Sequence, residues 1–400
     1  MKKKILITGA VVLVAAAVIL GFILKNQVRE NTDSTAVNVD IGQWDTTQNE
    51  SQNYWNPDNH AVAKGMGGYY FIQTTDGISK IAFFDETTQE AVAVCAKPEC
   101  THSDNTCNAY LCDMKQTGSA LYLTDTIYCY NGYLYLIQCE GGMGKLVRIH
   151  TDGSARETIA DLFANTGVSS ISLVFHENDV YAYDDTGHAG QEEEAEEVIK
   201  KISLTDGTEQ TVFSYTGTGA SIDRGRSFGD KLYFVIREYT KNKETKAVSS
   251  DYKGLFEYDF ATGDTRKVID ADVCDYHADT ENQMLFYFVQ GTGLYAYDMT
   301  QGSNTLIYPA EDELIQCKMS YDGKNLYLFN NGAGRATETK ARTQRYCYVL
   351  DTKGNQIAKI LCNGVVYFGD TDYLFEENAD NLEYMKKENL SDKSEWILIN

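Results

Sequence analysis

One short stretch of the chain gathers residues of the kind that bind transition metals. Residues 95–107, CAKPECTHSDNTC, contain three cysteines and a histidine, although the 400-residue chain has only ten cysteines and six histidines. Thiolates and imidazoles are the usual ligands of tetrahedral zinc. We therefore expect Cys95, Cys100, His102 and Cys107 to hold one structural zinc or iron ion. Because the protein supplies all four ligands, no position stays open for water or substrate, as catalysis by zinc requires.

Two alternatives remain open for this stretch. Cys95, Cys100, Cys107 and Cys112 could form disulfides if they lie outside the cytoplasm, and four cysteines allow three pairings. The stretch could also be an inert loop. The four residues between Cys95 and Cys100 exceed the two of common zinc motifs, whereas a disulfide cluster has no use for His102.

The N-terminus predicts a membrane anchor. Residues 5–24 are apolar and uncharged, and they follow Lys2, Lys3 and Lys4. About 20 helical residues at about 1.5 Å each span a hydrocarbon core of about 30 Å, and flanking lysines favour the cytoplasmic side. We expect residues 1–24 to anchor a single-pass protein in the cell membrane, with an extracytoplasmic globular domain at 61–400. A cleaved signal peptide is the alternative. Residues 25–60 are polar and predict a flexible linker.

The globular domain repeats one pattern seven times. A turn of Gly, Asp or Asn leads into an apolar strand near residues 67, 131, 177, 229, 281, 322 and 369. Neighbouring strands complete a repeat of four strands and about 49 residues, a period typical of propeller blades. We predict an all-β fold: a seven-bladed β-propeller of four-stranded antiparallel blades, preceded by one transmembrane helix. Residues 61–66 begin the first blade and 395–399 complete the seventh, so the ends exchange no strand.

Two phrases resemble a known group of proteins. The strand phrases LFEYDFATG and LYAYDMTQG, with the basic N-terminal span, are similar to uncharacterised membrane-anchored β-propellers of Gram-positive anaerobes, whose repeats resemble TolB-type and low-density-lipoprotein-receptor-type propellers. The phrase C-x-K-P-x-C-x-H-x4-C is shared within that group and is matched here from Cys95 to Cys107. The resemblance covers residues 60–400 and implies no known activity.

Long polar loops are predicted on one face of the propeller, together with residues 95–107, which we expect to connect the first two blades. Two of these loops are basic, although the net charge of the chain is −23. They could form a cleft for an acidic ligand, or they could be solvent-exposed loops with no binding role. The candidate ligand-binding residues are Lys241, Lys243, Lys246 and Lys253 in the fourth blade, and Arg335, Lys340, Arg342 and Arg345 in the sixth.

The sequence contains no motif for common catalytic sites, such as G-x-S-x-G, a Walker loop or H-E-x-x-H, so no catalytic or cofactor-binding residue is assigned. The acidic balance argues against nucleic acid as a partner. We expect a binding or scaffold module for a cell-surface protein or an anionic cell-wall polymer. The alternative is an extracellular carbohydrate-active enzyme, of lyase or hydrolase type, with its site at the axial mouth. An aromatic-filled channel would favour binding, whereas converging His, Asp and Glu side chains would favour an enzyme.

Overall fold

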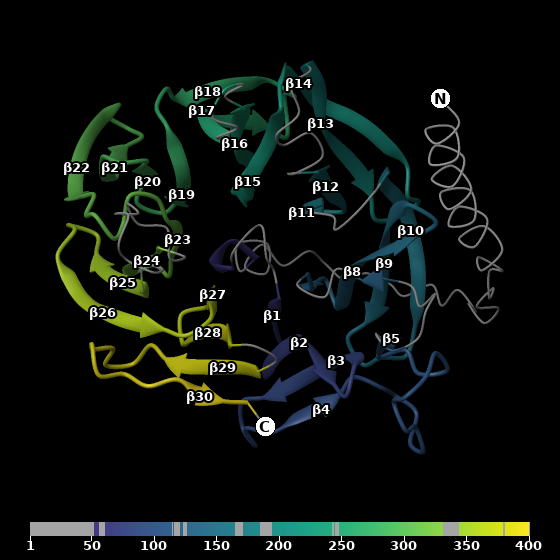
Figure 1. Cartoon of the computed structure of the whole chain (residues 1–400). Coiled ribbons are helices and arrows are strands. Elements are labelled where there is room, and N and C mark those ends of the chain that lie inside the picture. Colours follow the sequence, from purple (N-terminus) through teal and green to yellow (C-terminus); the bar gives the residue numbers. More distant parts are fainter. Residues whose placement is uncertain are drawn as a thin grey trace, which may run out of the picture.

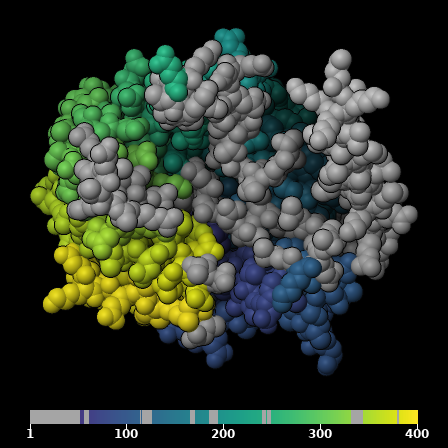
Figure 2. Space-filling model, in the orientation of Figure 1, coloured from purple at the N-terminus to yellow at the C-terminus, as the bar shows by residue number. Residues whose placement is uncertain are grey.

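The computed structural model describes residues 52–55, 61–113, 115, 121–122, 126–164, 171–184, 194–241, 244, 248–330, 344–378 and 381–399. These residues form seven antiparallel sheets in a ring (Figure 1). The predicted seven-bladed propeller is therefore confirmed, and the space-filling view shows the blades following one another around the ring (Figure 2). The predicted membrane span lies outside the described residues, among which no helix is long and apolar enough to cross a membrane.

Blades 1 to 4 follow one another along the chain, each running from an inner strand at the axis to an outer strand at the rim. Blade 1 contains β1 (Val62–Gly65), β2 (Gly68–Thr75), β3 (Ile78–Asp85), β4 (Ala91–Ala93) and β5 (Tyr110–Asp113). Blade 2 contains β6 (Leu121–Tyr122), β7 (Tyr128–Tyr130), β8 (Tyr133–Glu140), β9 (Met143–His150) and β10 (Arg156–Ala164). Blade 3 contains β11 (Ile171–His176), β12 (Asp179–Asp184), β13 (Glu194–Ser203) and β14 (Glu209–Thr218). Blade 4 contains β15 (Ala220–Phe228), β16 (Lys231–Lys241), β17 (Val248–Asp259) and β18 (Thr265–Ile269).

Blades 5 to 7 complete the ring with the same order of strands. Blade 5 contains β19 (Val273–Asp279), β20 (Met284–Val289), β21 (Gly293–Asp298) and β22 (Ser303–Pro309). Blade 6 contains β23 (Lys318–Tyr321), β24 (Asn325–Phe329), β25 (Arg345–Asp351) and β26 (Gln356–Cys362). Blade 7 contains β27 (Val365–Gly369), β28 (Tyr373–Asn378), β29 (Asn381–Lys386) and β30 (Ile397–Leu398).

Burial falls from the axis to the rim within a blade. In blade 5, every residue of β19 is buried, whereas the first four residues of β22 are exposed. The inner strands are covered on both faces because each blade packs against two neighbours, so both faces carry apolar side chains. The second strands predicted from the repeat correspond to β2, β8, β12, β16, β20, β24 and β28.

Polar side chains, most of them tyrosines, join each blade to the next. A tyrosine is suited to this place because its ring is apolar while its hydroxyl still finds a hydrogen-bond partner. Neighbouring blades are joined, in order around the ring, by Tyr70 to Thr151, Tyr130 to Glu177, Tyr183 to Gly225, Tyr276 to Arg224, Tyr321 to Asp279, Lys387 to Asp322 and Tyr69 to Asp370.

The ring closes between blades 7 and 1 without a shared strand, as predicted. The Tyr69 hydroxyl donates to Asp370 at 2.5 Å, and Lys64 Nζ lies 3.1 Å from the same carboxylate. Tyr69 also packs against Phe375, with ring centroids 4.7 Å apart. Closure therefore depends on side-chain contacts between two ends of the chain.

A short segment N-terminal to blade 1 lies at the centre of the ring and contacts the inner strands. We call this segment the plug: η1 (Gln52–Tyr54) and Trp55, drawn in purple at the centre of Figure 1. Gln52 exchanges two hydrogen bonds, of 2.8 and 2.9 Å, with the backbone of Phe175 in β11. Asn53 does the same with Ser227 in β15, whose N–H donates to Asn53 Oδ1 at 3.2 Å. The two amide side chains thus satisfy backbone groups of two inner strands.

The second half of the plug reaches the inner strands of blades 5, 6 and 7. The carbonyl of Tyr54 accepts a hydrogen bond of 2.9 Å from Ser320, and its ring lies parallel to that of His277 at 6.2 Å between centroids. Trp55 is 1% exposed and forms a β-bridge with Phe368. Trp55 also lies edge-on to Tyr69 of blade 1, so the plug contacts six blades through directional or aromatic interactions.

From the sequence, residues 52–55 are expected in the flexible linker, whereas the structure places them in the channel. The polar amides that make the segment resemble a linker are used to bond the backbone of inner strands. Residues 25–51 and 56–60 of the predicted linker lie outside the described residues.

Trp55→Ala is expected to destabilise the propeller by about 3–5 kcal/mol, because it empties a buried aromatic site. Trp396→Ala is the matched control, since Trp396 is partly exposed at the rim and should cost less. Urea denaturation of both variants measures the difference. Equal losses for the two variants would show that the plug does not support the ring.

A buried glutamate in blade 7 predicts a pH-dependent stability. Glu376 Oε2 accepts the N–H groups of Asn363 and Gly364 at 3.1 and 3.3 Å, and Glu383 lies opposite in the sheet. Burial, and then the nearby charge of Glu383, raise the pKa of Glu376 to about 7. The folded state therefore holds a proton that the unfolded state releases near its ordinary pKa, so stability is lost as pH rises through about 7.

Glu376→Gln is expected to remove this loss, because glutamine is neutral at every pH and keeps an acceptor for both N–H groups. We expect the variant to gain about 1–3 kcal/mol over the natural protein at pH 8 and little at pH 4. Denaturation curves from pH 4 to 8 measure it, with the exposed Glu281→Gln as control. A gain that is the same at every pH would contradict the assignment.

Candidate functional site

The cysteine-rich stretch interrupts the outer edge of blade 1. Both β4 and β5 pair with β3, so together they form one outer strand in two pieces. Ile81 in β3 holds both ends of the insertion: its carbonyl accepts the N–H of Val94 at 3.0 Å, and its N–H donates to the carbonyl of Ala109 at 2.8 Å. Residues 95–108, which we call the excursion, therefore leave the strand and return to it at one point.

This position corrects the expectation that residues 95–107 connect the first two blades on the face with the long loops. The strand resumes after the excursion, so the connection to blade 2 begins only after Asp113. The physical reason is that the ladder of β3 is long enough to pair with both β4 and β5.

The excursion rests on the β9–β10 turn of blade 2. Asn108 Nδ2 donates to the carbonyl of Gly153 at 2.8 Å, and Arg156 Nη1 donates to that of Tyr110 at 2.8 Å. Gly153 has a positive φ of 75°, and a Cβ there would lie 2.5 Å from the carbonyl oxygen of Val94. Only glycine allows this approach.

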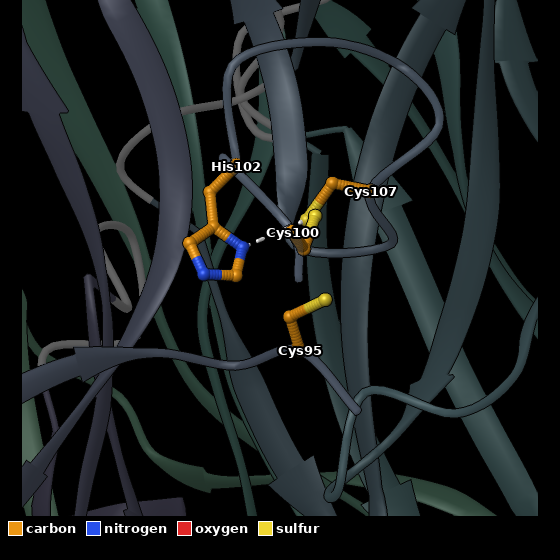
Figure 3. Close-up of side chains that lie close together, drawn as sticks. All are labelled: Cys95, Cys100, His102 and Cys107. Atoms are coloured by element: carbon orange, nitrogen blue, oxygen red, sulfur yellow. Dashed lines mark hydrogen bonds between the residues drawn. The ribbon is translucent and has the colours of Figure 1, made fainter. Parts of the chain in front are cut away.

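The structure brings the four predicted ligands together. One donor atom from each of Cys95, Cys100, His102 and Cys107 lies within 4.8 Å of all the others, and His102 Nδ1 is 3.3 Å from Cys107 Sγ. Figure 3 shows the four side chains close together, with the imidazole on one side and the cysteines on the other. His102 has a positive φ of 56°, which costs a non-glycine residue about 1 kcal/mol. Cys107 is buried, whereas the other three are partly exposed.

Backbone N–H groups point at the sulfurs. The N–H of Lys97 donates to Cys95 Sγ at 3.5 Å, two residues back in the chain. The N–H of His102 bonds Cys100 in the same relation, and this bond is the main cause that lowers the pKa of the Cys100 thiol. The N–H groups of Ala109 and Tyr110 bond Cys107. Donors of this kind stabilise thiolates, the form in which cysteine binds a metal.

A tetrahedral metal ion fits this donor set. Sulfurs bound to zinc at about 2.3 Å lie about 3.8 Å apart, so the group would contract by at most about 1 Å. Two cations stand nearby to offset the three thiolates: Lys97, whose ammonium donates to the carbonyl of Thr106, and Arg156 beside Cys107. Burial raises the pKa of Cys107 to about 12, so a metal would displace its proton.

All ten cysteines lie in the described part of the chain, and each is a free thiol. Cys112, the fourth member of the disulfide alternative, is buried in β5, outside the donor group. The structure therefore groups His102 with Cys95, Cys100 and Cys107. It does not arrange Cys95, Cys100, Cys107 and Cys112 as two pairs.

The basic loop residues are described only in part. Lys253 lies 2.8 Å from Glu238 and 2.6 Å from Asp251, so its charge is compensated within blade 4. Arg345 is partly buried in β25. The side chain of Lys241, and all of Lys243, Lys246, Arg335, Lys340 and Arg342, lie outside the described residues, and their role stays a prediction.

Charged residues near the axis were not found from the sequence. Arg226 and Asp275 form a buried pair at 2.6 Å between β15 and β19, and Asp275 also accepts the N–H of Met319 at 2.7 Å. Arg237 and Asp223 form a second pair at 2.6 Å. Arg226 and Asp275 lie on the inner strands of two blades, so only the ring brings this pair together, whereas Asp223 and Arg237 lie on the paired strands β15 and β16 of blade 4.

No family model matches the chain, and no curated protein matches it. Similar solved structures include an oligogalacturonate lyase in complex with manganese, which is 11% identical, with 87% of this chain and 89% of that chain covered and a TM-score of 0.50. Sqt1 of Saccharomyces cerevisiae is 10% identical over 86% of this chain and 96% of its own, with a TM-score of 0.40. The uncharacterised protein lmo1340 of Listeria monocytogenes is 12% identical over 67% and 79%, with a TM-score of 0.39. At 11% identity, the likeness to the lyase concerns the fold alone.

The purified, reduced protein is expected to contain about one equivalent of zinc or iron, and a chelator should loosen the excursion without unfolding the ring, whose core does not depend on it. His102→Ala should make residues 95–112 more sensitive to protease, whereas His176→Ala, on blade 3, should not. Elemental analysis and limited proteolysis measure both. Less than about a tenth of an equivalent of metal, with an equally resistant His102→Ala variant, would end the metal interpretation.

Proposed function

We propose that the protein is a membrane-anchored, extracytoplasmic binding or scaffold propeller. The observation that carries this proposal is the plug, which occupies the axial channel with the chain's own residues. A site at the axis needs space for substrate, and Asn53 and Trp55 are 2% and 1% exposed there. A binding function needs only the outer surface, which the plug leaves free.

The bonding of the axial carboxylates supports the same proposal. A catalytic acid or base must have an atom free to reach substrate. Asp275 is bonded to Arg226 and to two backbone N–H groups, and Asp279 accepts from Tyr321 and Asn282. The alternative carbohydrate-active enzyme would have to break these bonds or use residues outside the described part of the chain.

The membrane anchor and the outward orientation rest on the sequence. Three lysines precede an apolar segment long enough to span the bilayer, and the acidic domain that follows suits an aqueous space. We propose the cell membrane as the location, and a cell-surface protein or an anionic cell-wall polymer as the partner. The basic loops of blades 4 and 6 supply positive charge for an anionic polymer.

Cys95, Cys100, His102 and Cys107 hold one structural zinc or iron ion in this proposal. The support is the convergence of four donor atoms, the backbone N–H groups that bond the sulfurs, and the nearby cations. The ion would fix the excursion against blade 2 and take no part in chemistry, because every ligand comes from the protein.

Full-length protein in detergent is expected to capture a purified anionic wall polymer at low salt and to release it at high salt, because exposed charges are screened. Replacing Lys241, Lys243, Arg342 and Arg345 with Ser should weaken capture severalfold and reduce its salt dependence. Lys393→Ser, near the C-terminus, is the single-site control. If the quadruple variant captures as much polymer as the natural protein, the basic loops have no role in binding it.

A further inference from the structure

A cleft of about 460 Å³ lies between the outer strand of blade 4 and the face of blade 5. One wall is the end of β18 and the connection after it, with Val268, Asp270 and Ala271. The other wall consists of side chains from three neighbouring strands of blade 5: Tyr287, Val289, Tyr295, Tyr297 and Asn304. The volume is that of a typical small-ligand site.

Tyrosines form the wall from blade 5. Tyr287 and Tyr295 are direct partners across β20 and β21, and their rings stack with centroids 5.4 Å apart and an angle of 12°. Tyr297 lies two residues further along β21, so it projects from the same face. Asn304 in β22 is the cross-strand partner of Tyr297. Register thus places three rings and one amide side by side.

The polar groups of this wall are uncharged and partly unused. The Tyr287 hydroxyl donates to Asn304 Oδ1 at 3.0 Å. Among the described residues, neither the Tyr295 nor the Tyr297 hydroxyl has a hydrogen-bond partner. The one carboxylate in the lining, that of Asp270, is paired with Lys267 at 2.8 Å. The cleft therefore presents aromatic rings and free hydroxyls, and the charge of its one carboxylate, Asp270, is balanced by Lys267.

We propose that this cleft binds an uncharged saccharide chain. The C–H groups on one side of a sugar ring carry partial positive charge and are attracted to the negative face of an aromatic ring. The hydroxyls at the edge of the sugar need uncharged donors and acceptors, which Tyr295, Tyr297 and Asn304 supply. This goes beyond the binding function proposed above, because it assigns a second surface, apart from the basic loops, and a ligand class.

Charge and backbone pairing disfavour other ligands. The lining residues include no cation that would bind an anionic chain, and the protein as a whole carries a net charge of −23. A peptide that binds by adding a strand needs an open edge. Both edges of β20 and of β21, which carry the three tyrosines, are already paired within blade 5, and among the described residues only the outer strands β18 and β22 keep an unpaired edge near the cleft. The tyrosine wall thus offers side chains rather than backbone.

The test uses full-length protein in a zwitterionic detergent without a sugar headgroup. Isothermal titration compares uncharged hexasaccharides of glucose and of N-acetylglucosamine with hexagalacturonate and a proline-rich decapeptide. We expect an uncharged hexasaccharide to bind, and Tyr295→Ala to weaken it about tenfold or more. Tyr297→Phe, which keeps the ring and removes only the hydroxyl, should weaken it severalfold and fold normally. Tyr346→Ala, in the next blade, is the matched control and should bind as the natural protein does.

Three results would overturn the proposal. They are binding of neither uncharged hexasaccharide, binding of the peptide or hexagalacturonate alone, and saccharide binding that is unchanged in both Tyr295→Ala and Tyr297→Phe. Polymer capture through the basic loops is measured separately, so failure of the cleft and failure of the proposed function are distinguishable.

Discussion

The closure of the ring is the constraint on which the rest of the structure depends. Seven blades enclose an axis only if the last packs against the first, and here no strand crosses that interface. Trp55 lies against both sides of it, with its ring 6.2 Å from Tyr69 of blade 1 and 5.7 Å from Phe375 of blade 7. The bond from Tyr69 to Asp370 adds a buried polar contact. The plug and the closing interface are therefore one structural unit.

The plug and the closing interface also limit which surfaces of the molecule are available for binding. The inner strands that line the axis are bonded to the plug, to one another or to neighbouring blades, so many of the polar groups there are already used, although Arg226 Nε and His277 Nε2 are buried without a partner among the described residues. The surfaces left for binding are the loops and the rim, where burial is lowest. The excursion and the tyrosine cleft both lie toward the rim, at the boundaries between blades 1 and 2 and between blades 4 and 5.

The regular parts of the molecule could be predicted because they repeat. Each second strand follows a turn with Gly, Asp or Asn and carries an apolar run, a pattern that needs no knowledge of distant contacts. The four candidate metal ligands were found for a similar reason, since they lie within thirteen residues of one another. Local spacing was enough to group Cys95 with Cys107. It did not indicate that both lie in an insertion between β4 and β5, the two pieces of one outer strand.

The parts that depend on distant contacts were not predictable. Asn53 is 174 residues from Ser227, so nothing near it in the chain indicates that its amide bonds an inner strand. Two aromatic residues, Tyr54 and Trp55, in a polar stretch were the available signal. The Tyr287–Tyr295 wall was likewise hidden, because each tyrosine alone resembles an ordinary strand residue.

The central claim is that the chain's own plug occupies the channel, and amide hydrogen exchange tests it most directly. The N–H groups of Phe175 and Ser227 donate to the side chains of Gln52 and Asn53. The account predicts that both amides exchange as slowly as those of β19, and that Gln52→Ala and Asn53→Ala speed each one selectively. Exchange as fast as that of the exposed turns, unchanged in the two variants, would show that the channel is open and would return the axial enzyme site to consideration.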